Sequence, residues 1–180
     1  ATAEFHLGRP VSNVLDVGCG EGAWQPILAA LRPDASYLGL ESSEYAVRRY
    51  GVERNIRPLR FGQLGELRFD HRFDLIVCAD VLHYLRGAEI ERGLPGLVAN
   101  LAGMAFIEVY TAQDRIQGDL EGFLKRPTRW YRQAFAAAGF HGIEIVKRQG
   151  EPWRTVEGIE FRSITVTASK TSELEAAAVV

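Results

Sequence analysis

The sequence has few cysteines, no long hydrophobic run and no excess of charge of one sign. Its 180 residues include only two cysteines, Cys19 and Cys78, which are too few for a disulfide framework or a cysteine-built zinc site. No apolar stretch approaches the roughly 18 residues that a membrane-spanning helix needs. Residues 1–10 contain no basic region followed by an apolar one, so we expect no secretory signal. These absences predict a cytoplasmic protein with reduced thiols and no membrane partner.

Charge and histidine content argue against two further classes of protein. The chain has 21 Lys and Arg residues against 23 Asp and Glu residues, a formal net charge of -2. A protein whose main partner is a nucleic acid usually carries a basic excess, so we expect no nucleic-acid partner. The four histidines, His6, His71, His83 and His141, are scattered, with no pair at helical ligand spacing. We therefore expect no bound metal.

Short apolar runs alternate with amphipathic stretches along most of the chain. This pattern predicts strands at residues 12–17, 37–40, 56–61, 73–78 and 104–109, and helices at 23–31, 43–50, 89–101 and 130–138. Such an alternation is typical of a mostly parallel sheet with helices on both faces. Two final strands, at 143–147 and 161–167, have no helix between them, which predicts an antiparallel pair. We expect one domain over residues 1–168 and a flexible tail over 169–180.

A glycine-rich turn follows the first predicted strand. Residues 14–22 read Val-Leu-Asp-Val-Gly-Cys-Gly-Glu-Gly and precede the first predicted helix. Glycines at alternate positions allow a tight turn and let a ligand approach the backbone closely. The unpaired N–H groups at the start of the next helix favour a carboxylate or a phosphate. The sequence therefore predicts a nucleotide-type ligand at this turn.

Two acidic residues narrow the choice of ligand. Glu41 ends the second predicted strand, 23 residues after Gly18, where a carboxylate can accept both hydroxyls of a ribose. Asp16 lies inside the first strand, just before the turn. An acid there disfavours a phosphate but suits a cofactor that carries an ammonium and a sulfonium. The alternative role for Asp16 is to accept hydrogen bonds from N–H groups of the turn.

With these motifs the chain resembles the class I S-adenosylmethionine-dependent methyltransferases. The matching segments are residues 14–22, Leu-Gly-Leu-Glu-Ser-Ser at 38–43 and Phe-Asp-Leu-Ile-Val-Cys-Ala-Asp-Val-Leu-His-Tyr-Leu at 73–85, within a resemblance that spans residues 11–168. The resemblance implies an α/β, Rossmann-like three-layer sandwich with a mostly parallel seven-stranded sheet that ends in a C-terminal antiparallel strand pair. It also implies S-adenosyl-L-methionine as the cofactor. Members usually carry one or two helices before the first strand, whereas about ten residues precede Val11 here.

The resemblance implies which residues contact the cofactor. The glycine turn would hold its methionine part, Glu41 its ribose, and the segment after the third strand its adenine. Many members bond the adenine amino group with an acid, and the best match here is Gln63, whose side-chain carbonyl could take that place. The predicted cofactor-binding residues are Asp16, Gly18, Cys19, Gly20, Gly22, Glu41, Ser42, Gly62, Gln63, Leu64 and Ala79.

Residues after the fourth predicted strand are candidates for catalysis. Methyl transfer relies mainly on orientation and a dry site, but a hydroxyl acceptor usually needs a general base. His83 titrates near neutrality and is the first candidate base, and Asp80 is the second. Alternatively, Asp80 holds a cation or caps a helix, and His83 is an exposed helical residue. Candidates for an aromatic wall around the acceptor are Tyr84, Tyr110 and Trp130, although Trp130 also suits a packing role.

The sequence as a whole predicts a methyltransferase that acts on an oxygen or nitrogen of a small molecule. Residues 78–81 read Cys-Ala-Asp-Val and lack the Asn/Asp-Pro-Pro-Tyr/Phe motif of many enzymes that methylate nucleic acids or protein amides. One alternative is an NAD(P)-dependent oxidoreductase, because Ala23 is a permitted third residue of a Gly-x-Gly-x-x-Gly turn. Asp16 and the final strand pair argue against it. The other alternative is a non-catalytic binding module. The sequence does not determine the acceptor or the oligomeric state.

Overall fold

The core of the fold is a five-stranded parallel sheet. The computed structural model describes residues 2–114, 121–148, 154–156, 159–161 and 164–170. The sheet has the order β3-β2-β1-β4-β5, and every neighbouring pair is parallel. Its strands are β1 (Asn13–Val17), β2 (Ser36–Glu41), β3 (Ile56–Pro58), β4 (Phe73–Ala79) and β5 (Leu101–Glu108). The strand order reverses between β1 and β4, and open sheets of this kind bind ligands at that switch point, beyond the carboxyl ends of the strands.

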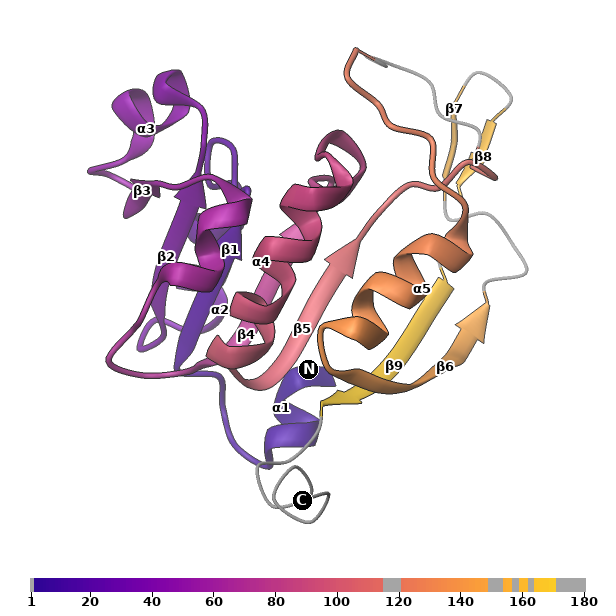
Figure 1. The fold of residues 1–180 in the computed structure, drawn as a ribbon. Helices are drawn as coiled ribbons and strands as arrows, with labels where there is room; N and C mark the ends of the chain where they lie inside the picture. The colour runs from indigo at the N-terminus through magenta and orange to yellow at the C-terminus, as the bar shows by residue number, and fades with distance from the viewer. Residues whose placement is uncertain (1, 115–120, 149–153, 157–158, 162–163, 171–180) are drawn as a thin grey trace.

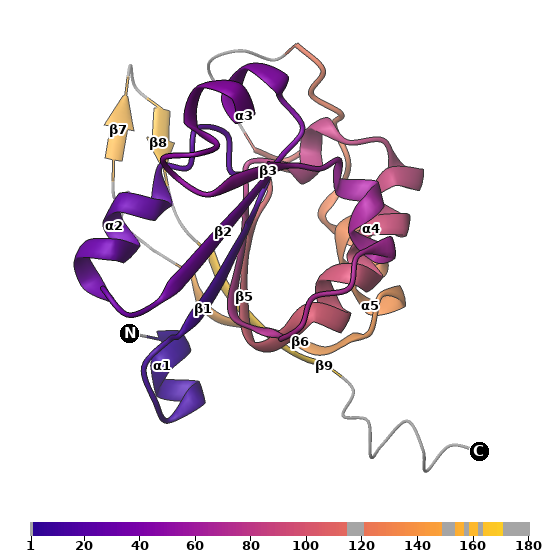
Figure 2. The ribbon, with the colours of Figure 1, turned by 90° about the vertical axis from the view of Figure 1, so that its left-hand side faces the viewer.

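Helices cover both faces of the sheet, as the alternating pattern predicts. Figure 2 shows α1 and α2 on one face and α4 and α5 on the other. Two buried apolar clusters match these faces: one contains Val14 and Tyr37, and the other contains Leu15 and Ile76. The helical elements are α1 (Thr2–Leu7), α2 (Trp24–Leu31), α3 (Glu44–Tyr50), α4 (Gly87–Asn100), α5 (Thr128–Ala137) and the 3-10 turns η1 (Phe61–Glu66) and η2 (Leu82–Tyr84).

Helix α4 contributes three fully buried residues to the main core. Ile90, Leu94 and Leu97 recur at helical spacing and are fully buried, which places one face of α4 on the sheet. The neighbouring turn η1 packs against α4 through two glycines of the helix. A Cβ atom at Gly96 would lie 2.4 Å from the carbonyl oxygen of Leu64. Glycine is therefore required at this position for α4 and η1 to approach each other.

The predicted seven-stranded sheet is wrong for the part of the chain that the structure describes. The strands β6 (Phe140–Arg148) and β9 (Ile164–Lys170) are antiparallel, but they form a separate two-stranded sheet. In Figure 1 this pair is drawn beyond β5. A second small sheet joins β7 (Arg154–Val156) to β8 (Ile159–Phe161). An apolar pattern predicts that a segment is a strand, whereas its partner depends on which backbone edge it reaches, so the pairing was harder to predict than the strands.

Three further boundaries differ from the sequence-based expectation. The third strand ends at Pro58, residues 59–60 belong to no helix or strand, and a 3-10 turn begins at Phe61, where the strand was predicted to end. Helix α1 was not predicted; Ala3 packs against the sheet in the smaller apolar cluster. Strand β9 extends to Lys170, two residues beyond the predicted end of the domain. The rest of the predicted tail, residues 171–180, lies outside the described residues. None of the helices in the described ranges has the length and apolar character that crossing a membrane would require.

Candidate cofactor and acceptor site

The glycine turn has the backbone geometry that its sequence predicts. Gly18, Gly20 and Gly22 have φ angles of 70°, 56° and 76°, in the left-handed region that side chains rarely adopt. The N–H groups of Gly18 and Cys19 donate to the carbonyl oxygen of Leu40, at 2.7 and 3.2 Å. A Cβ atom at Gly18 would also lie 2.3 Å from Cγ2 of Val81, which follows β4. The turn is thus held between the ends of β2 and β4.

Glu41 joins this turn to the end of β2. Its Oε2 atom accepts the N–H of Gly20 at 2.8 Å, and its Oε1 atom accepts the N–H groups of Ser42 and Ser43 at 2.7 and 2.8 Å. The Ser42 hydroxyl also donates to Oε1, at 3.2 Å. A carboxylate oxygen offers about two acceptor sites, so Oε1 is saturated while Oε2 can still accept one hydrogen bond. A ribose hydroxyl suits that remaining site.

Asp16 is buried on β1 with a single oxygen held by a tyrosine. The residue is 2% exposed, and its Oδ2 atom accepts the hydroxyl of Tyr37 at 2.7 Å. The N–H groups of the turn go instead to Leu40 and Glu41, so the alternative role for Asp16 as their acceptor does not fit this arrangement. Burial raises the pKa of Asp16 to about 6; the hydrogen bond from Tyr37 lowers it and the charge of Glu41 raises it. Sequence reasoning missed Tyr37, which reads as an ordinary strand residue.

Two other predicted cofactor residues lie at the same edge of the sheet. Cys19 follows Gly18 in the turn, and burial raises the pKa of its thiol to about 12. Its Sγ atom occupies the space beside Gly39, where a Cβ would lie only 2.7 Å away. Ala79 is half-buried at the end of β4. Both residues are therefore near the switch point, and their contact with a cofactor stays a prediction.

The segment predicted to line adenine forms η1 and faces partly into the core. Leu64 is fully buried in the main core, and a Cβ at Gly62 would meet Glu89 of α4 at 3.1 Å. Gln63 is exposed, but its Oε1 atom already accepts the N–H of Arg60 at 3.0 Å. The carbonyl predicted to replace the family's adenine-binding acid is thus engaged within its own turn.

Asp80 begins the acceptor side of the site. Asp80 is exposed, and its backbone has a φ of 59°, in the left-handed region that residues other than glycine seldom adopt. This conformation costs energy and is enriched at functional sites. Its N–H group donates to the carbonyl oxygen of Glu108 at 3.3 Å. Burial and the charge of Asp80 raise the pKa of Glu108. Burial also raises the pKa of Tyr110, with further contributions from Asp80, Glu108 and Asp114. This end of the sheet is therefore negatively charged.

His83 lies beneath an aromatic cluster. It is 1% exposed, which disagrees with the alternative of an exposed helical residue. Its ring centroid is 4.3, 5.2 and 5.3 Å from those of Tyr84, Tyr110 and Phe123. Its Nδ1 atom accepts the N–H of Tyr110 at 3.4 Å, which places the proton of the neutral ring on Nε2. Burial lowers the pKa of His83, so the ring is neutral at pH 7.

Residues 123–126 pack against His83 and the turn η2. The N–H of Leu124 donates to the His83 carbonyl oxygen at 2.8 Å, and the Arg126 guanidinium donates to the Leu85 carbonyl oxygen at 2.6 Å. The structure thus brings together four predicted residues, Asp80, His83, Tyr84 and Tyr110. Tyr84 is 44% exposed and presents its ring to solvent. Glu108 and Phe123 complete this group and were not predicted, because only the pairing of Glu108 with Ala79 of β4 and the contact of Phe123 with His83 reveal them.

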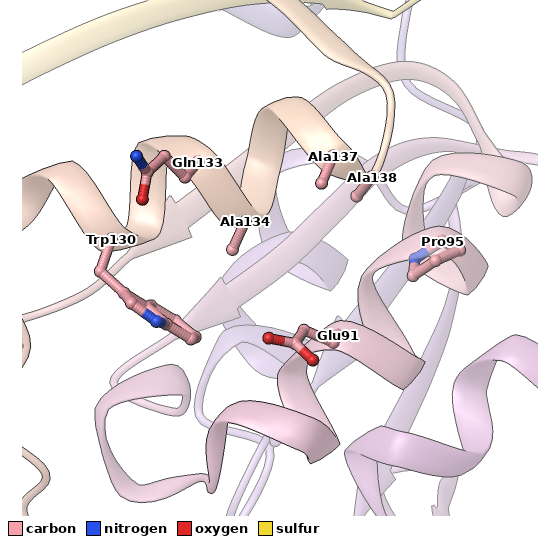
Figure 3. Close-up of a pocket in the computed structure, with 7 residues that line it drawn as sticks. All are labelled: Glu91, Pro95, Trp130, Gln133, Ala134, Ala137 and Ala138. Atoms are coloured by element: carbon pink, nitrogen blue, oxygen red, sulfur yellow. The ribbon is translucent and has the colours of Figure 1, made fainter.

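Trp130 lies apart from the other predicted substrate residues. Arg126 is stacked on its ring at 4.6 Å. With Glu91 and Pro95 of α4 it lines a cavity of 290 Å³ between α4 and α5, where Figure 3 shows its ring facing Glu91. A second cavity, of 110 Å³, lies beside Tyr37 and Leu28. Neither of these two cavities contains the glycine turn or Glu41. In the part of the chain that the structure describes, no three His, Cys, Asp or Glu side chains are grouped as for a metal ion.

Comparison with known proteins assigns the fold and the glycine turn to one family. Residues 15–103 match the family model of a methyltransferase domain. The chain is 29% identical to the release factor glutamine methyltransferase of Escherichia coli over 164 residues, which are 81% of this chain and 58% of that protein. It is 35% identical to the trans-aconitate 2-methyltransferase of Deinococcus radiodurans over 77 residues, 43% of this chain and 30% of that protein. The chain thus spans less than two thirds of either curated relative.

A solved structure shows the same fold. The TehB-like SAM-dependent methyltransferase of Corynebacterium glutamicum has a TM-score of 0.61 and 20% identity, over 94% of this chain and 86% of that one. Fold, motifs and domain match define an α/β domain of the methyltransferase type. The chain thus contains a methyltransferase domain over residues 15–103 and shares the Rossmann-like fold of S-adenosylmethionine-dependent methyltransferases. The predicted resemblance is therefore confirmed for the methyltransferase domain.

Proposed function

We propose that this protein transfers a methyl group from S-adenosylmethionine to an oxygen or nitrogen of a small molecule. One observation supports this proposal most strongly. At the ends of the adjacent strands β1 and β2, two carboxylates, Asp16 and Glu41, flank a turn of left-handed glycines. This arrangement suits a ligand with a ribose and a cationic amino acid part, whereas the phosphates of a dinucleotide would meet like charge.

The residues present fit S-adenosylmethionine, which would supply an activated methyl group on its sulfonium. Glu41 would accept a ribose hydroxyl at Oε2 and keep the turn closed through Gly20. Accepting a second hydroxyl at Oε1 requires the loss of a hydrogen bond from Ser42 or Ser43. Asp16 would hold the ammonium of the methionine part, because a buried carboxylate interacts strongly with a cation.

The acceptor side supports a small molecule with a hydroxyl or amine. Asp80 offers an exposed carboxylate beside the rings of Tyr84 and Tyr110, so it suits a general base or an anchor for an amine. His83 is less suited to be the base, because its Nδ1 lone pair faces the N–H of Tyr110. The motif typical of amide methylation is missing at residues 78–81. This favours a small molecule over the protein glutamine that the Escherichia coli relative's name indicates.

Calorimetry tests the cofactor first. We expect S-adenosylhomocysteine to bind and NAD to show no binding under the same conditions. Binding of NAD without binding of S-adenosylhomocysteine would instead support the oxidoreductase alternative. Methyl transfer from labelled S-adenosylmethionine to a panel of small hydroxyl and amine compounds then tests catalysis. Binding without turnover on any acceptor, including proteins, would support the non-catalytic module.

A further inference from the structure

One face of β2 carries Tyr37, Gly39 and Glu41. This face lies beside Asp16 of the neighbouring strand β1. In the parallel register Asp16 is paired with Gly39, and residues two apart on a strand share a face. Gly39 has no side chain, and a Cβ there would lie 3.3 Å from the Tyr37 hydroxyl and 2.7 Å from Cys19 Sγ. The missing side chain therefore leaves the space in which the Tyr37 hydroxyl reaches Asp16.

We propose that Tyr37 is a positioning residue that orients the Asp16 carboxylate toward the cofactor's ammonium. The inference rests on the proposed function, in which Asp16 contacts the cofactor. The hydroxyl of Tyr37 donates to Oδ2 at 2.7 Å, and both residues are buried. Within the described residues no hydrogen bond reaches Oδ1, so this oxygen is left for the ligand. A hydrogen bond on one oxygen fixes the rotation of the carboxylate and thereby the direction of the other oxygen.

Tyr37 also favours the charged form of Asp16. The titratable groups that act on this carboxyl are Tyr37 and Glu41 of β2, while the thiols of Cys19 and Cys78 lie close enough to feel its charge. Burial raises the pKa of Asp16 to about 6, and the Tyr37 hydrogen bond opposes that rise. Without the hydroxyl the pKa rises further, so a larger fraction of the carboxyl is protonated near neutral pH. A neutral Asp16 attracts an ammonium less strongly.

The test is calorimetry of S-adenosylhomocysteine binding between pH 5.5 and 8.5. Wild-type affinity should weaken as the pH falls through about 6. Tyr37→Phe should bind about 10- to 150-fold more weakly at pH 7, the effect of one hydrogen bond to a charged group. Its pH dependence should also shift to higher pH, which a purely structural role would not cause. Tyr50→Phe, at a tyrosine of α3 that packs against Arg49 and Arg54, is the matched control and should behave as wild type.

Two further variants separate the possible outcomes. Asp16→Asn should bind weakly without this pH dependence, and adding Tyr37→Phe should cause no additional loss. Gly39→Ala places a Cβ 2.7 Å from Cys19 Sγ and 3.3 Å from the Tyr37 hydroxyl, so it crowds both groups without removing either. It should shift the pH dependence in the same direction, even if Tyr37→Phe does not fold. Wild-type affinity and pH dependence in both Tyr37→Phe and Gly39→Ala would overturn the inference while leaving the proposed function intact. Absence of binding by the wild type would overturn the proposed function, and the inference with it.

Discussion

At the scale of single residues, Glu41 has two roles in one carboxylate. It accepts three backbone N–H groups, from Gly20, Ser42 and Ser43, and it retains one acceptor site on Oε2. Hydrogen bonds to a charged group are stronger than those between neutral groups. The residue that is predicted to recognise the cofactor therefore also holds the glycine turn in place before any ligand binds.

Replacing Glu41 should affect both roles. We expect Glu41→Ala to weaken binding of S-adenosylhomocysteine by roughly 1–3 kcal/mol, the range for a hydrogen bond to a charged group. Calorimetry measures the binding, and thermal unfolding should show a lower midpoint because the turn loses its acceptor. The control is Glu44→Ala, at the exposed first residue of α3. Unchanged affinity in Glu41→Ala would contradict the assigned ribose site.

Asp80 and His83 should differ in what their replacement changes. Asn tolerates the left-handed backbone of Asp80, so Asp80→Asn removes the charge with little strain. If the acceptor is a hydroxyl, single-turnover methyl transfer should slow by about 10²–10⁴, the range for a general base. Cofactor affinity should stay near the wild-type value. A wild-type transfer rate in Asp80→Asn on a hydroxyl acceptor would remove Asp80 as the base.

His83→Ala should also lower turnover with little change in cofactor affinity, but for a different reason. The variant removes the ring that Tyr84, Tyr110 and Phe123 surround, so the acceptor wall loses its support. Because the pKa of His83 is lowered by burial, the turnover of the wild type should show no decline from His83 protonation near pH 7. Turnover equal to wild type in His83→Ala would remove both a catalytic and a supporting role.

At the scale of elements, the α4–η1 contact connects the core to the segment predicted to line adenine. Leu64 of η1 is buried against α4, and Gly96 allows the backbone of the two elements to touch. The position of Gly62 and Gln63 therefore depends on a contact inside the core. Binding of the cofactor's adenine at η1 would depend on this packing as well as on the side chains that face the adenine.

Gly96→Ala tests this contact. A Cβ 2.4 Å from the Leu64 carbonyl cannot be accommodated without moving η1. We expect a loss of about 1–3 kcal/mol in the free energy of unfolding, typical of overpacking, despite the higher helix propensity of alanine. Urea unfolding measures it. Gly87→Ala, where the nearest atom is the end of the Trp130 side chain at 3.3 Å, is the control and should change stability far less.

At the scale of the whole molecule, the buried acid of the site reduces the stability of the fold. An Asp whose pKa is about 6 when folded, against about 3.9 when unfolded, binds more protons in the folded state between these values. The free energy of unfolding therefore falls as the pH rises from about 4 to about 6 and stays lower above that window. The charged form of Asp16, which the predicted cofactor contact needs, therefore lowers the free energy of unfolding.

Asp16→Asn should therefore stabilise the protein while weakening cofactor binding. We expect a gain on the order of 3 kcal/mol at pH 7, because the pKa differs by about two units and each unit corresponds to about 1.4 kcal/mol. At pH 4 the gain should vanish, because Asp16 is protonated in the folded wild type. Chemical unfolding at the two pH values measures the difference. An equal effect at both pH values would show that the charge of Asp16 is not the cause.

Much of the fold followed from local pattern. Buried runs such as residues 14–17 and 73–78 predicted the central strands, and the helix predicted at 43–50 agrees with α3 to within one residue. The pairing of β6 with β9 as a separate sheet did not follow, because strand partners are set by contacts far apart in the sequence. In the site, the turn and Glu41 were predictable from spacing. Tyr37 and Phe123 were not, because nothing near them in the sequence indicates what they contact.

The sequence by itself indicated the methyltransferase domain, the parallel sheet and the glycine turn, since these rest on residue types and short spacings. The tertiary structure alone decided how the polar groups are used. In the folded chain both oxygens of Glu41 accept backbone N–H groups. The Tyr37 hydroxyl contacts Asp16 because Gly39 has no side chain, and His83 is buried against three aromatic rings. Burial and hydrogen bonding determine the charge and direction of a side chain, and both arise only when distant segments pack together.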